Sequence, residues 1–353
     1  MPSEYCVSIE KLTALVETIF KKFGLDDQDA RTMAKSLTDA NARGMHSHGV
    51  LRVENYVKKL AMGSINPHPD IKTLSESPFS AVLDGDNGLG CIVSQKAAEL
   101  CRCKAEAVGI GCVSVRNSNH YGTSAYYCEQ MAGDDMIAFS CSNVEPIMAP
   151  PGATQVAIGN NPFCMVAPAG RHRNFCSDMA SSQIAWGKVM DYRLSGKKLP
   201  DKWAIDAQGN PTDDPNRAVF LMPMGAHKGY GIAAQLEILC SLLSGGAFGD
   251  RIPGMYKELE KPNQLSHFFM CMKISAFRDI NIFKADMDQF MDFLHGIQTR
   301  DGGNIIVPGE LEERHKAAAV KSGITITETL AKELLELAYG NLNCDIAVYL
   351  SQL

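Results

Sequence analysis

The chain has 353 residues, of which 45% are hydrophobic and 21% charged, and it carries a formal net charge of −6 with a pI near 5.9. That composition is typical of a globular protein with one large domain or two to three smaller ones, and its acidic balance argues against nucleic acid and anionic membranes as partners. Twelve cysteines without a CxxC pair, no leader sequence and no apolar run of about 18 residues predict a reduced, cytoplasmic chain that does not span a membrane.

The N-terminal part of the chain shows helical periodicity. Apolar residues recur on one face after Ser8, which is a good N-cap, and glycines mark the helix ends. We predict three helices, at about 8–24, 26–44 and 47–63. The stretch GMHSHG (44–49) is therefore predicted to be a tight link between two helices, where rigid elements on both sides can hold functional side chains.

From about residue 80, short apolar strands alternate with helices. We predict strands at AVLDGD, GIGCVSVRNS, MIAFSCSN, VAIGNNPFCMVAP, NFCSDMA and HFFMCMKIS. Predicted helices lie near 94–108, 123–133, 182–196 and 228–245, and 197–215 reads as a long polar loop. This alternation predicts an α/β layer.

Three more helices, at about 286–300, 310–322 and 328–340, are predicted to close the chain. Neither an internal repeat nor a low-complexity linker divides the sequence. We therefore predict a helical N-terminal segment over 1–75, an α/β core over 76–300 and a helical C-terminal segment over 301–353.

His46 and His48 lie one residue apart in the GMHSHG link. An HxH pair can be half of a metal site, with His120 and Asp178 as further candidate ligands. No HExxH or similar spacing accompanies the pair, so the metal interpretation rests on an isolated motif.

Arg52 follows four residues after His48, at the start of a predicted helix. A guanidinium group matches a carboxylate with two parallel hydrogen bonds, and helix N-termini favour negative charge. The pattern therefore favours a small anion at this place. A surface arginine paired with Glu54 or Asp39 is the alternative.

The stretch VRNSNHYGTSAYY (115–127) follows a predicted strand and opens a predicted helix, a position where ligands of α/β proteins collect. Asn117 and Ser118 could equally cap the helix, but capping has no need of the imidazole of His120. A histidine with a pKa near neutral suits reversible proton transfer at an alcohol or carbonyl.

Two further stretches open predicted helices. Asp178 in SDMASS either caps a helix or holds a catalytic histidine or a ligand, and both readings stay open. Lys228 and two glycines in AHKGYG suit the approach of a phosphate to a helix N-terminus. Neither GxxxxGK[ST] nor GxGxxG after a strand is present, so motifs alone do not name a cofactor.

Five blocks, in this order, resemble one known family: RGMHSHGVLRVENY, VRNSNHYGTSAYY, APPGATQVAIGNNPFCMVAP, SDMASSQIAWGKV and HKGYGIAAQLEILCSLLSGGAFG. They resemble the type 2 malate/L-lactate dehydrogenase family, which also holds ureidoglycolate, sulfolactate and cyclic-imine reductases. The resemblance runs from about residue 5 to 345. It implies an NAD(P)-dependent oxidoreductase with a non-Rossmann nucleotide-binding fold, a mixed sheet, helical ends and a homodimeric assembly.

The resemblance also assigns roles residue by residue. His120 matches the proton-exchanging histidine, and His48 and Arg52 match residues at the carboxylate end of the substrate. The residues that match cofactor contacts are Asp178, Met179, Ala180, Lys228, Pro308, Gly309 and Glu310.

One position departs from the family pattern. Members often carry serine or threonine within an SNxxP run, whereas this chain has Val144 and Glu145 there. Because valine cannot donate a hydrogen bond, Ser142 or Asn143 is the expected side-chain contact to the nicotinamide.

We therefore predict hydride transfer between a nicotinamide cofactor and a 2-hydroxy acid. Arg52 is expected to bind the carboxylate and His48 a neighbouring oxygen, while His120 exchanges the proton and Asp178 orients an imidazole. His46 is assigned to structure.

Malate and oxaloacetate are the predicted substrate pair, because NSNHYG resembles the malate and sulfolactate branch. Ureidoglycolate, lactate and sulfolactate are alternatives within the family. NAD is predicted over NADP because the sequence shows no basic cluster suited to a ribose 2′-phosphate. A metal-dependent hydrolase or lyase using His46, His48 and His120 is the alternative of another class.

Overall fold

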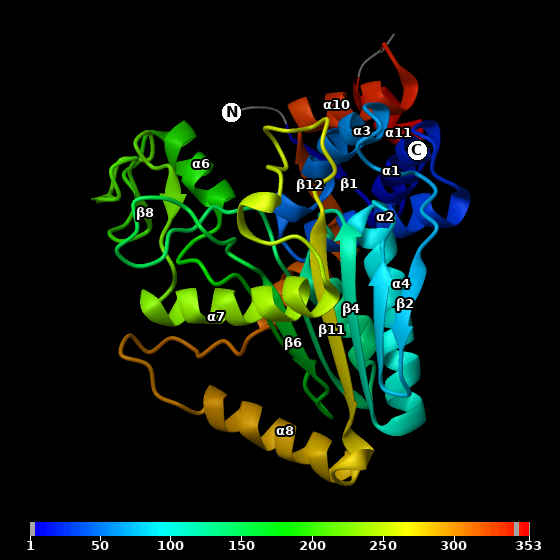
Figure 1. The fold of residues 1–353 in the computed structure, drawn as a ribbon, viewed down its shortest axis with the longest axis vertical. Coiled ribbons are helices and arrows are strands. Elements are labelled where there is room, and N and C mark those ends of the chain that lie inside the picture. Colours follow the sequence, from blue (N-terminus) through cyan, green and yellow to red (C-terminus); the bar gives the residue numbers. More distant parts are fainter. Residues whose placement is uncertain (1–3, 342–345, 353) are drawn as a thin grey trace.

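The protein is described by a computed structural model that covers residues 4–341 and 346–352. Figure 1 shows a long mixed sheet through the middle of the molecule, with a group of helices from both ends of the chain at one end of it. This arrangement confirms the predicted α/β class with helical terminal segments. The part of the chain that is described holds no helix long and apolar enough to cross a membrane.

The central sheet has seven strands. Its order is β2 (Lys72–Glu76), β3 (Ser80–Asp84), β4 (Ile110–Ser118), β11 (Leu265–Lys273), β5 (Met136–Ser142), β6 (Phe163–Ala167) and β7 (Phe175–Met179). Only β3 and β4 are parallel, and the other neighbours are antiparallel. The sheet is therefore mixed, as predicted, and differs from the parallel sheet of a Rossmann fold.

Helices cover both faces of this sheet. One face packs against α4 (Gly90–Val108) and α5 (Ser124–Ala132), and the other against α7 (His227–Glu237) and its π-helical continuation Ile238–Leu242. Side chains alternate between the faces, as strand geometry requires. Phe269 on β11 belongs to the core under α4 and α5, whereas its neighbour Phe268 packs with Leu236 of α7.

The two ends of the chain share one hydrophobic core. It is formed by α1 (Ile9–Lys22), α2 (Asp27–Ala42), α3 (Val53–Ala61), α10 (Glu328–Tyr339) and α11 (Ile346–Gln352), beside an antiparallel pair of β1 (Glu4–Val7) and β12 (Ile324–Thr327). The predicted N-cap is confirmed, because Ser8 Oγ accepts a hydrogen bond from the Lys11 N–H at 3.2 Å. The predicted division at 75/76 falls within β2, and the three segments stay a prediction.

Three predicted elements differ from the structure. The predicted loop at 197–215 contains β8 (Ala204–Ile205) and β9 (Pro211–Thr212). β8 pairs with β9 on one side and with β10 (Phe220–Leu221) on the other, in a small sheet that follows α6 (Trp186–Ser195). The helix predicted at 286–300 is α8 (Ile280–His295), because the Asp279 carboxylate caps it at its start. The third N-terminal helix begins at Val53, after two 3-10 turns, rather than at Ser47.

Candidate active site

The loop that carries the paired histidines is held by one side chain of α2. Asn41 Oδ1 accepts a hydrogen bond from the Val50 N–H at 2.7 Å, and Asn41 Nδ2 lies 3.0 Å from His46 Nδ1. A side chain at Gly49 would meet Asn41 Oδ1 at 1.8 Å, so this position requires glycine. These contacts occupy His46 at the exposed side of the loop, in agreement with a structural role.

His48, Arg52 and Tyr56 lie four residues apart and face the end of β4, where His120 follows the strand. The His48 and His120 rings stack with their centroids 5.6 Å apart. The Tyr56 hydroxyl lies 2.6 Å from His120 Nδ1, and the Gly122 nitrogen lies 3.4 Å from the same atom. With Nδ1 held from the protein side, Nε2 is the nitrogen of His120 left for a substrate.

Arg52 lies beside the two imidazoles. Its Nε donates to the Ser47 carbonyl at 2.6 Å, and its guanidinium carbon sits 5.2 Å from the centre of the Tyr256 ring. Within the described chain that hydrogen bond uses only Nε, so the two terminal nitrogens keep the fork geometry that suits a carboxylate. The pKa of nearby Glu145 is raised by burial, and the positive charges of Arg52 and Lys59 offset only part of this increase.

Burial and positive charge hold both imidazoles in the neutral form. Burial, and then the Arg52 charge, lowers the pKa of His48 to about 4. Burial also lowers the pKa of His120 well below 6.5, and the charges of Arg52, His48 and His267 act in the same direction. A neutral His120 can accept the proton of an alcohol, and once protonated it is a strong acid toward a carbonyl.

A buried imidazole on β11 supports this end of the sheet. His267 bridges the hydroxyls of Ser118 and Ser142, each at 2.9 Å, and its ring stacks on Tyr121 with centroids 4.6 Å apart. Burial lowers the pKa of His267 to about 3, so it holds the strands together as a neutral hydrogen-bonding group.

Ser142 and Asn143 belong to the same buried framework. Asn143 Nδ2 donates to Ser241 Oγ at 2.6 Å, and its Oδ1 accepts from the Ser266 N–H at 2.7 Å. Ser142 Oγ contacts His267 and the Asn143 carbonyl. These contacts involve side chains that are only 0–1% exposed, and the expected nicotinamide contact at Ser142 or Asn143 stays a prediction.

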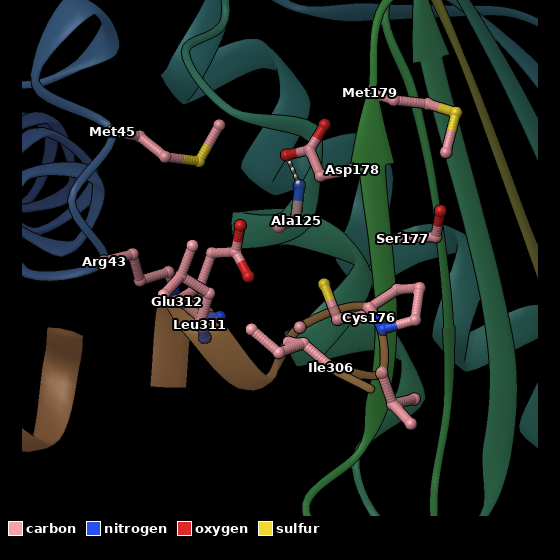
Figure 2. A pocket seen from close by; sticks show the side chains of 13 residues that line it. Arg43, Met45, Ala125, Cys176, Ser177, Asp178, Met179, Ile306, Leu311 and Glu312 are labelled. Carbon is pink, nitrogen blue, oxygen red and sulfur yellow. Dashed lines mark hydrogen bonds between the residues drawn. The ribbon is translucent and has the colours of Figure 1, made fainter. Parts of the chain in front are cut away.

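A cavity of about 250 Å³ lies beside β7, and neither His48 nor His120 is among its lining residues. Figure 2 shows side chains from the turn after α2, from β7, and from the first turn of α9 (Glu310–Ser322) and the segment before it around this cavity. Met45 links it to the His48 loop, and Ala125 links it to His120 through the start of α5. The lining residues are Arg43, Met45, Ala125, Cys176, Ser177, Asp178, Met179, Ile306, Val307, Pro308, Gly309, Leu311 and Glu312.

Asp178 caps the helix that follows His120. Its Oδ2 accepts a hydrogen bond from the Ala125 N–H at 2.9 Å, which satisfies a free donor in the first turn of α5 (Figure 2). Burial raises the pKa of Asp178 to about 6. In the described residues the contact at His120 Nδ1 comes from Tyr56, while Asp178 contacts the start of α5. The role of Asp178 in orienting an imidazole stays a prediction.

The Pro308–Glu310 segment closes the other side of the cavity. The Cys176 N–H donates to the Pro308 carbonyl at 3.1 Å, and a side chain at Gly309 would come within 2.9 Å of Cys176 Cβ. Gly309 has φ +96°, so this close approach also needs the freedom of glycine. Glu310 points away, to the Val307 N–H at 3.1 Å and to His295 at 2.7 Å.

One wall of the cavity is an open strand edge with polar backbone groups. β7 is an edge strand, and because the Cys176 N–H points outward to Pro308, the backbone N–H and carbonyl of Asp178 point to the same side. They can pair with a carboxamide, while Ile306, Leu311 and Met179 offer apolar contact. Thr123 Oγ1, at the start of α5, is buried and has no hydrogen-bond partner among the residues that the structure describes.

Other predicted residues lie elsewhere. Ala180 and Glu310 do not line the cavity, and Lys228 is exposed in the first turn of α7. His46, His48 and His120 do not form a metal-binding group among the described residues; the group that does is described below. Sequence analysis missed Tyr56, which the four-residue spacing from Arg52 could have indicated, and Tyr256, for which no local signal exists.

Comparisons with known proteins agree with this geometry. The family model described as malate/L-lactate dehydrogenase matches residues 7–335. The chain is 38% identical to an L-sulfolactate dehydrogenase of Methanocaldococcus jannaschii, over 92% of this chain and 93% of the relative, and 36% identical to a malate dehydrogenase of Pyrococcus abyssi, over 93% of each. The crystal structure of a malate dehydrogenase from Entamoeba histolytica superposes with a TM-score of 0.91 at 28% identity, covering 97% of this chain and 99% of that one.

Proposed function

The chain belongs to the malate/L-lactate dehydrogenase family and is a hydroxy-acid dehydrogenase, and from this premise we propose that it interconverts malate and oxaloacetate with NAD as its cofactor. The observation that carries the proposal is the cluster of one guanidinium fork and two neutral, stacked imidazoles beside the cavity. With the dehydrogenase class established by the family, a metal-dependent hydrolase or lyase at these histidines is the wrong class.

We assign the substrate's C1 carboxylate to Arg52. The terminal nitrogens of its guanidinium bind the two carboxylate oxygens, and the contact with Tyr256 and the Ser47 carbonyl fixes the plane of the fork. His48, neutral and stacked on His120, donates a hydrogen bond to an oxygen of the substrate next to the reacting carbon. Both contacts orient C2 before the reaction.

We assign proton transfer to Nε2 of His120. In malate oxidation the hydroxyl proton moves to Nε2 as the C2–H bond breaks, and the imidazolium that forms donates its Nδ1 proton to the Tyr56 hydroxyl. A nicotinamide cofactor, when bound, would supply the hydride acceptor for this oxidation and the hydride donor for the reverse reaction. In oxaloacetate reduction the imidazolium gives its Nε2 proton to the new alkoxide, and the nearby Arg52 charge favours that release.

The residues proposed to hold the cofactor are those of the cavity. The backbone of Asp178 and Met179 on β7 and the Pro308–Gly309 turn flank the place for the nicotinamide. Lys228, at the exposed start of α7, is proposed to meet the phosphates further along the molecule, with Ala180 between the two. NAD is proposed over NADP because the sequence shows no basic cluster suited to a ribose 2′-phosphate.

Sulfolactate is the second candidate substrate, because an L-sulfolactate dehydrogenase is among the most similar relatives. Malate and sulfolactate share the C1 carboxylate and the C2 hydroxyl, and they differ in a carboxylate or a sulfonate at C3. The Arg52 and His120 assignments hold for both, so the choice between them depends on groups that meet the C3 anion.

A substrate panel followed at 340 nm tests the proposal. Oxaloacetate, sulfopyruvate, pyruvate, 2-oxoglutarate and a cyclic imine are each combined with NADH and NADPH. We expect the largest kcat/KM for oxaloacetate with NADH. A larger value for sulfopyruvate would transfer the assignment to the second candidate, and consumption of NADH with the cyclic imine alone would contradict a hydroxy-acid substrate.

A further inference from the structure

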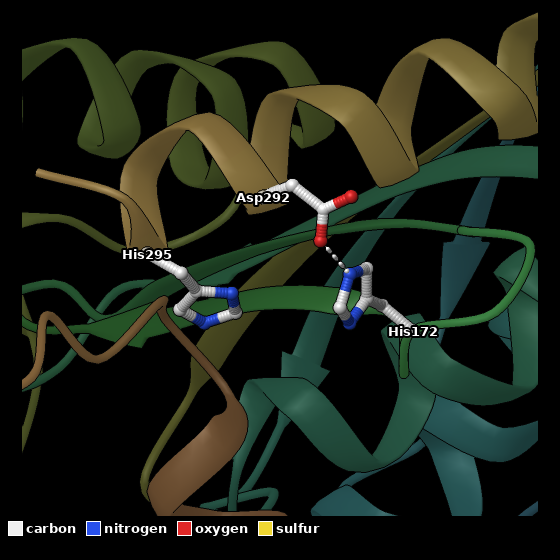
Figure 3. A group of neighbouring side chains, drawn as sticks. All are labelled: His172, Asp292 and His295. Atoms are coloured by element: carbon white, nitrogen blue, oxygen red, sulfur yellow. Dashed lines mark hydrogen bonds and ion pairs between the residues drawn. The ribbon is translucent and has the colours of Figure 1, made fainter.

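A second cluster of ligand-type side chains lies away from the proposed active site. His172 comes from the loop between β6 and β7, while Asp292 and His295 lie one turn apart on α8. One donor atom from each lies within 4.8 Å of the other two. Figure 3 shows Asp292 between the two imidazoles, with a ring nitrogen of each turned toward it. Two imidazoles and a carboxylate are the donors that zinc and related ions prefer.

His295 and Asp292 each have one nitrogen or oxygen atom that faces away from the cluster and already contacts another side chain. His295 Nε2 lies 2.7 Å from Glu310 Oε1, which leaves Nδ1 facing the cluster. Asp292 Oδ2 is bound by Arg171, and Oδ1 lies 2.8 Å from His172 Nε2. A carboxylate behind a metal-binding imidazole fixes its tautomer and raises its basicity, which is the arrangement seen at His295.

The loop that carries His172 is itself fixed. The Asp288 carboxylate accepts hydrogen bonds from the backbone N–H groups of Gly170, Arg171 and His172 at 2.8–3.2 Å. This anchor sits one turn before Asp292 on α8, so the two parts of the cluster are positioned by the same helix. The imidazole of His172 is therefore placed by buried backbone contacts and not by its ion pair with Asp292.

The charge around the cluster favours a cation. Three carboxylates, Asp288, Asp292 and Glu310, are balanced by two guanidinium groups, Arg171 and Arg314, which leaves one negative charge with neutral histidines. Arg171 binds the Asp292 oxygen that the ion does not need, and its side chain is 63% exposed, so it can turn away from an incoming ion.

We propose that His172 Nε2, Asp292 Oδ1 and His295 Nδ1 bind a divalent cation of the zinc class, with water as the fourth ligand. Tetrahedral binding places the donors about 3.3 Å apart, given metal–ligand distances near 2.0–2.1 Å. The pair of His172 Nε2 and Asp292 Oδ1, now 2.8 Å apart, opens slightly, and the other pairs, which lie within 4.8 Å, close where they are wider. The ion links α8 to the β6–β7 loop and, through Glu310, to the Pro308–Gly309 turn that lines the cavity. The role of the ion is to stabilise the position of the Pro308–Gly309 turn.

Cobalt binding to the metal-free full-length protein tests the site, because Co²⁺ replaces zinc in such sites and reports its geometry by visible absorption. We expect wild type to bind one equivalent more Co²⁺ than His295→Ala, with absorption typical of a tetrahedral ion that the variant lacks. Zn²⁺ at about 100 times its Kd should raise the Tm of wild type by about 3 °C and leave that of His295→Ala unchanged.

His68→Ala is the matched control, because it removes an exposed histidine from a distant loop and should keep both responses. Asp292→Asn is a second variant that preserves shape and should lose the cobalt absorption, and circular dichroism verifies that each variant is folded. Equal Co²⁺ stoichiometry and equal Zn²⁺ response in wild type, His295→Ala and Asp292→Asn would overturn the proposal. None of these readouts depends on dehydrogenase activity.

Discussion

At the scale of single residues, the proposed chemistry requires that His120 is neutral before the reaction and can still accept a proton during it. Burial beside the cationic Arg52 lowers its pKa, and the Tyr56 hydroxyl accepts from Nδ1 when the ring becomes charged. The neutral ring with its proton on Nδ1 donates to the same hydroxyl, which leaves Nε2 without a proton and able to accept one. The same arrangement explains why His48, with a pKa near 4, serves as a neutral hydrogen-bond donor.

The first prediction concerns His120. His120→Ala should lower kcat for oxaloacetate reduction by about 10²–10⁴-fold, the usual range for general acid–base catalysis. NADH binding, measured by fluorescence titration, should stay nearly unchanged. His68→Ala serves as the control with full activity. A His120→Ala enzyme that keeps most of its kcat would remove the proton-transfer assignment.

The second prediction concerns Arg52. Arg52→Lys keeps the positive charge but removes the planar guanidinium group that makes two parallel hydrogen bonds. Loss of such a buried charged hydrogen bond costs on the order of 2–5 kcal/mol. We expect kcat/KM for oxaloacetate, with NADH saturating, to fall by about 30-fold or more.

Arg31→Lys is the matched control for Arg52→Lys, because Arg31 is an exposed arginine that pairs with Glu17 at 3.5 Å. Exposed ion pairs contribute about 0–1 kcal/mol, so this change should leave kcat/KM unaffected. A decrease of less than about threefold for Arg52→Lys would mean that this residue does not anchor the substrate.

Residue patterns could indicate some of these partners and not others. The four-residue spacing of His48, Arg52 and Tyr56 lies in the sequence and places them on one side of the loop and α3. The contact of Tyr56 with His120 joins residues far apart in the chain, and so does that of Arg52 with Tyr256. A single sequence carries no local signal for such contacts, because they arise only when β4, β11 and the helical end pack together.

At the scale of elements, local signals predict the long helices and the buried strands well. Ser8 caps α1 as the sequence indicates, because capping depends on neighbouring residues alone, and Asp26 caps α2 in the same way. The two-residue strands β8 and β9 were missed, since so short a ladder is stabilised by its partners and not by periodicity. The helix start at Val53 was also missed, because a remote side chain, Asn41, takes the Val50 N–H.

The cap of α5 yields a prediction about pH. Asp178 has a folded-state pKa of about 6, above the value near 3.9 for an unfolded chain. Its contribution to the free energy of unfolding is therefore most favourable below pH 4 and is lost as pH rises through 6. Asp178→Asn keeps an oxygen for the Ala125 N–H and cannot ionise. As pH rises from 4 to 6, the free energy of unfolding of the variant should increase relative to that of wild type. The total difference should be about 1–2 kcal/mol, allowing for the partial exposure of Asp178.

Urea unfolding at several pH values measures this difference. Asp279→Asn, at the exposed cap of α8, is the control and should show no such gain above pH 6. If the free energy of unfolding of Asp178→Asn tracks that of wild type at every pH, the buried carboxyl does not titrate as described.

At the scale of the whole molecule, apolar surface remains exposed although the terminal helices are covered. Those helices bury one another within the chain. Large apolar side chains that stay exposed include Phe293 of α8, at 66%, and Leu242 after α7, at 55%. Patches of this kind mark protein interfaces.

We therefore predict a homodimer, as the family resemblance implies. Light scattering at micromolar protein should give about twice the chain mass of 38.4 kDa. Phe293→Asp should shift the protein toward the monomer, whereas Phe79→Asp, on an exposed turn outside that surface, should not. An active wild-type monomer at these concentrations would be inconsistent with the assembly.

The central claim is that hydride passes between C2 of a 2-hydroxy acid and a nicotinamide ring in this protein. Deuterium labelling tests it most directly: NADH with both C4 hydrogens replaced by deuterium is mixed with oxaloacetate, and the product is examined by proton NMR. The account predicts malate with deuterium at C2, and its formation should be slowed strongly in His120→Ala. Malate that carries ordinary hydrogen at C2, or oxaloacetate left unreduced while wild-type protein is folded and NADH is saturating, would contradict it.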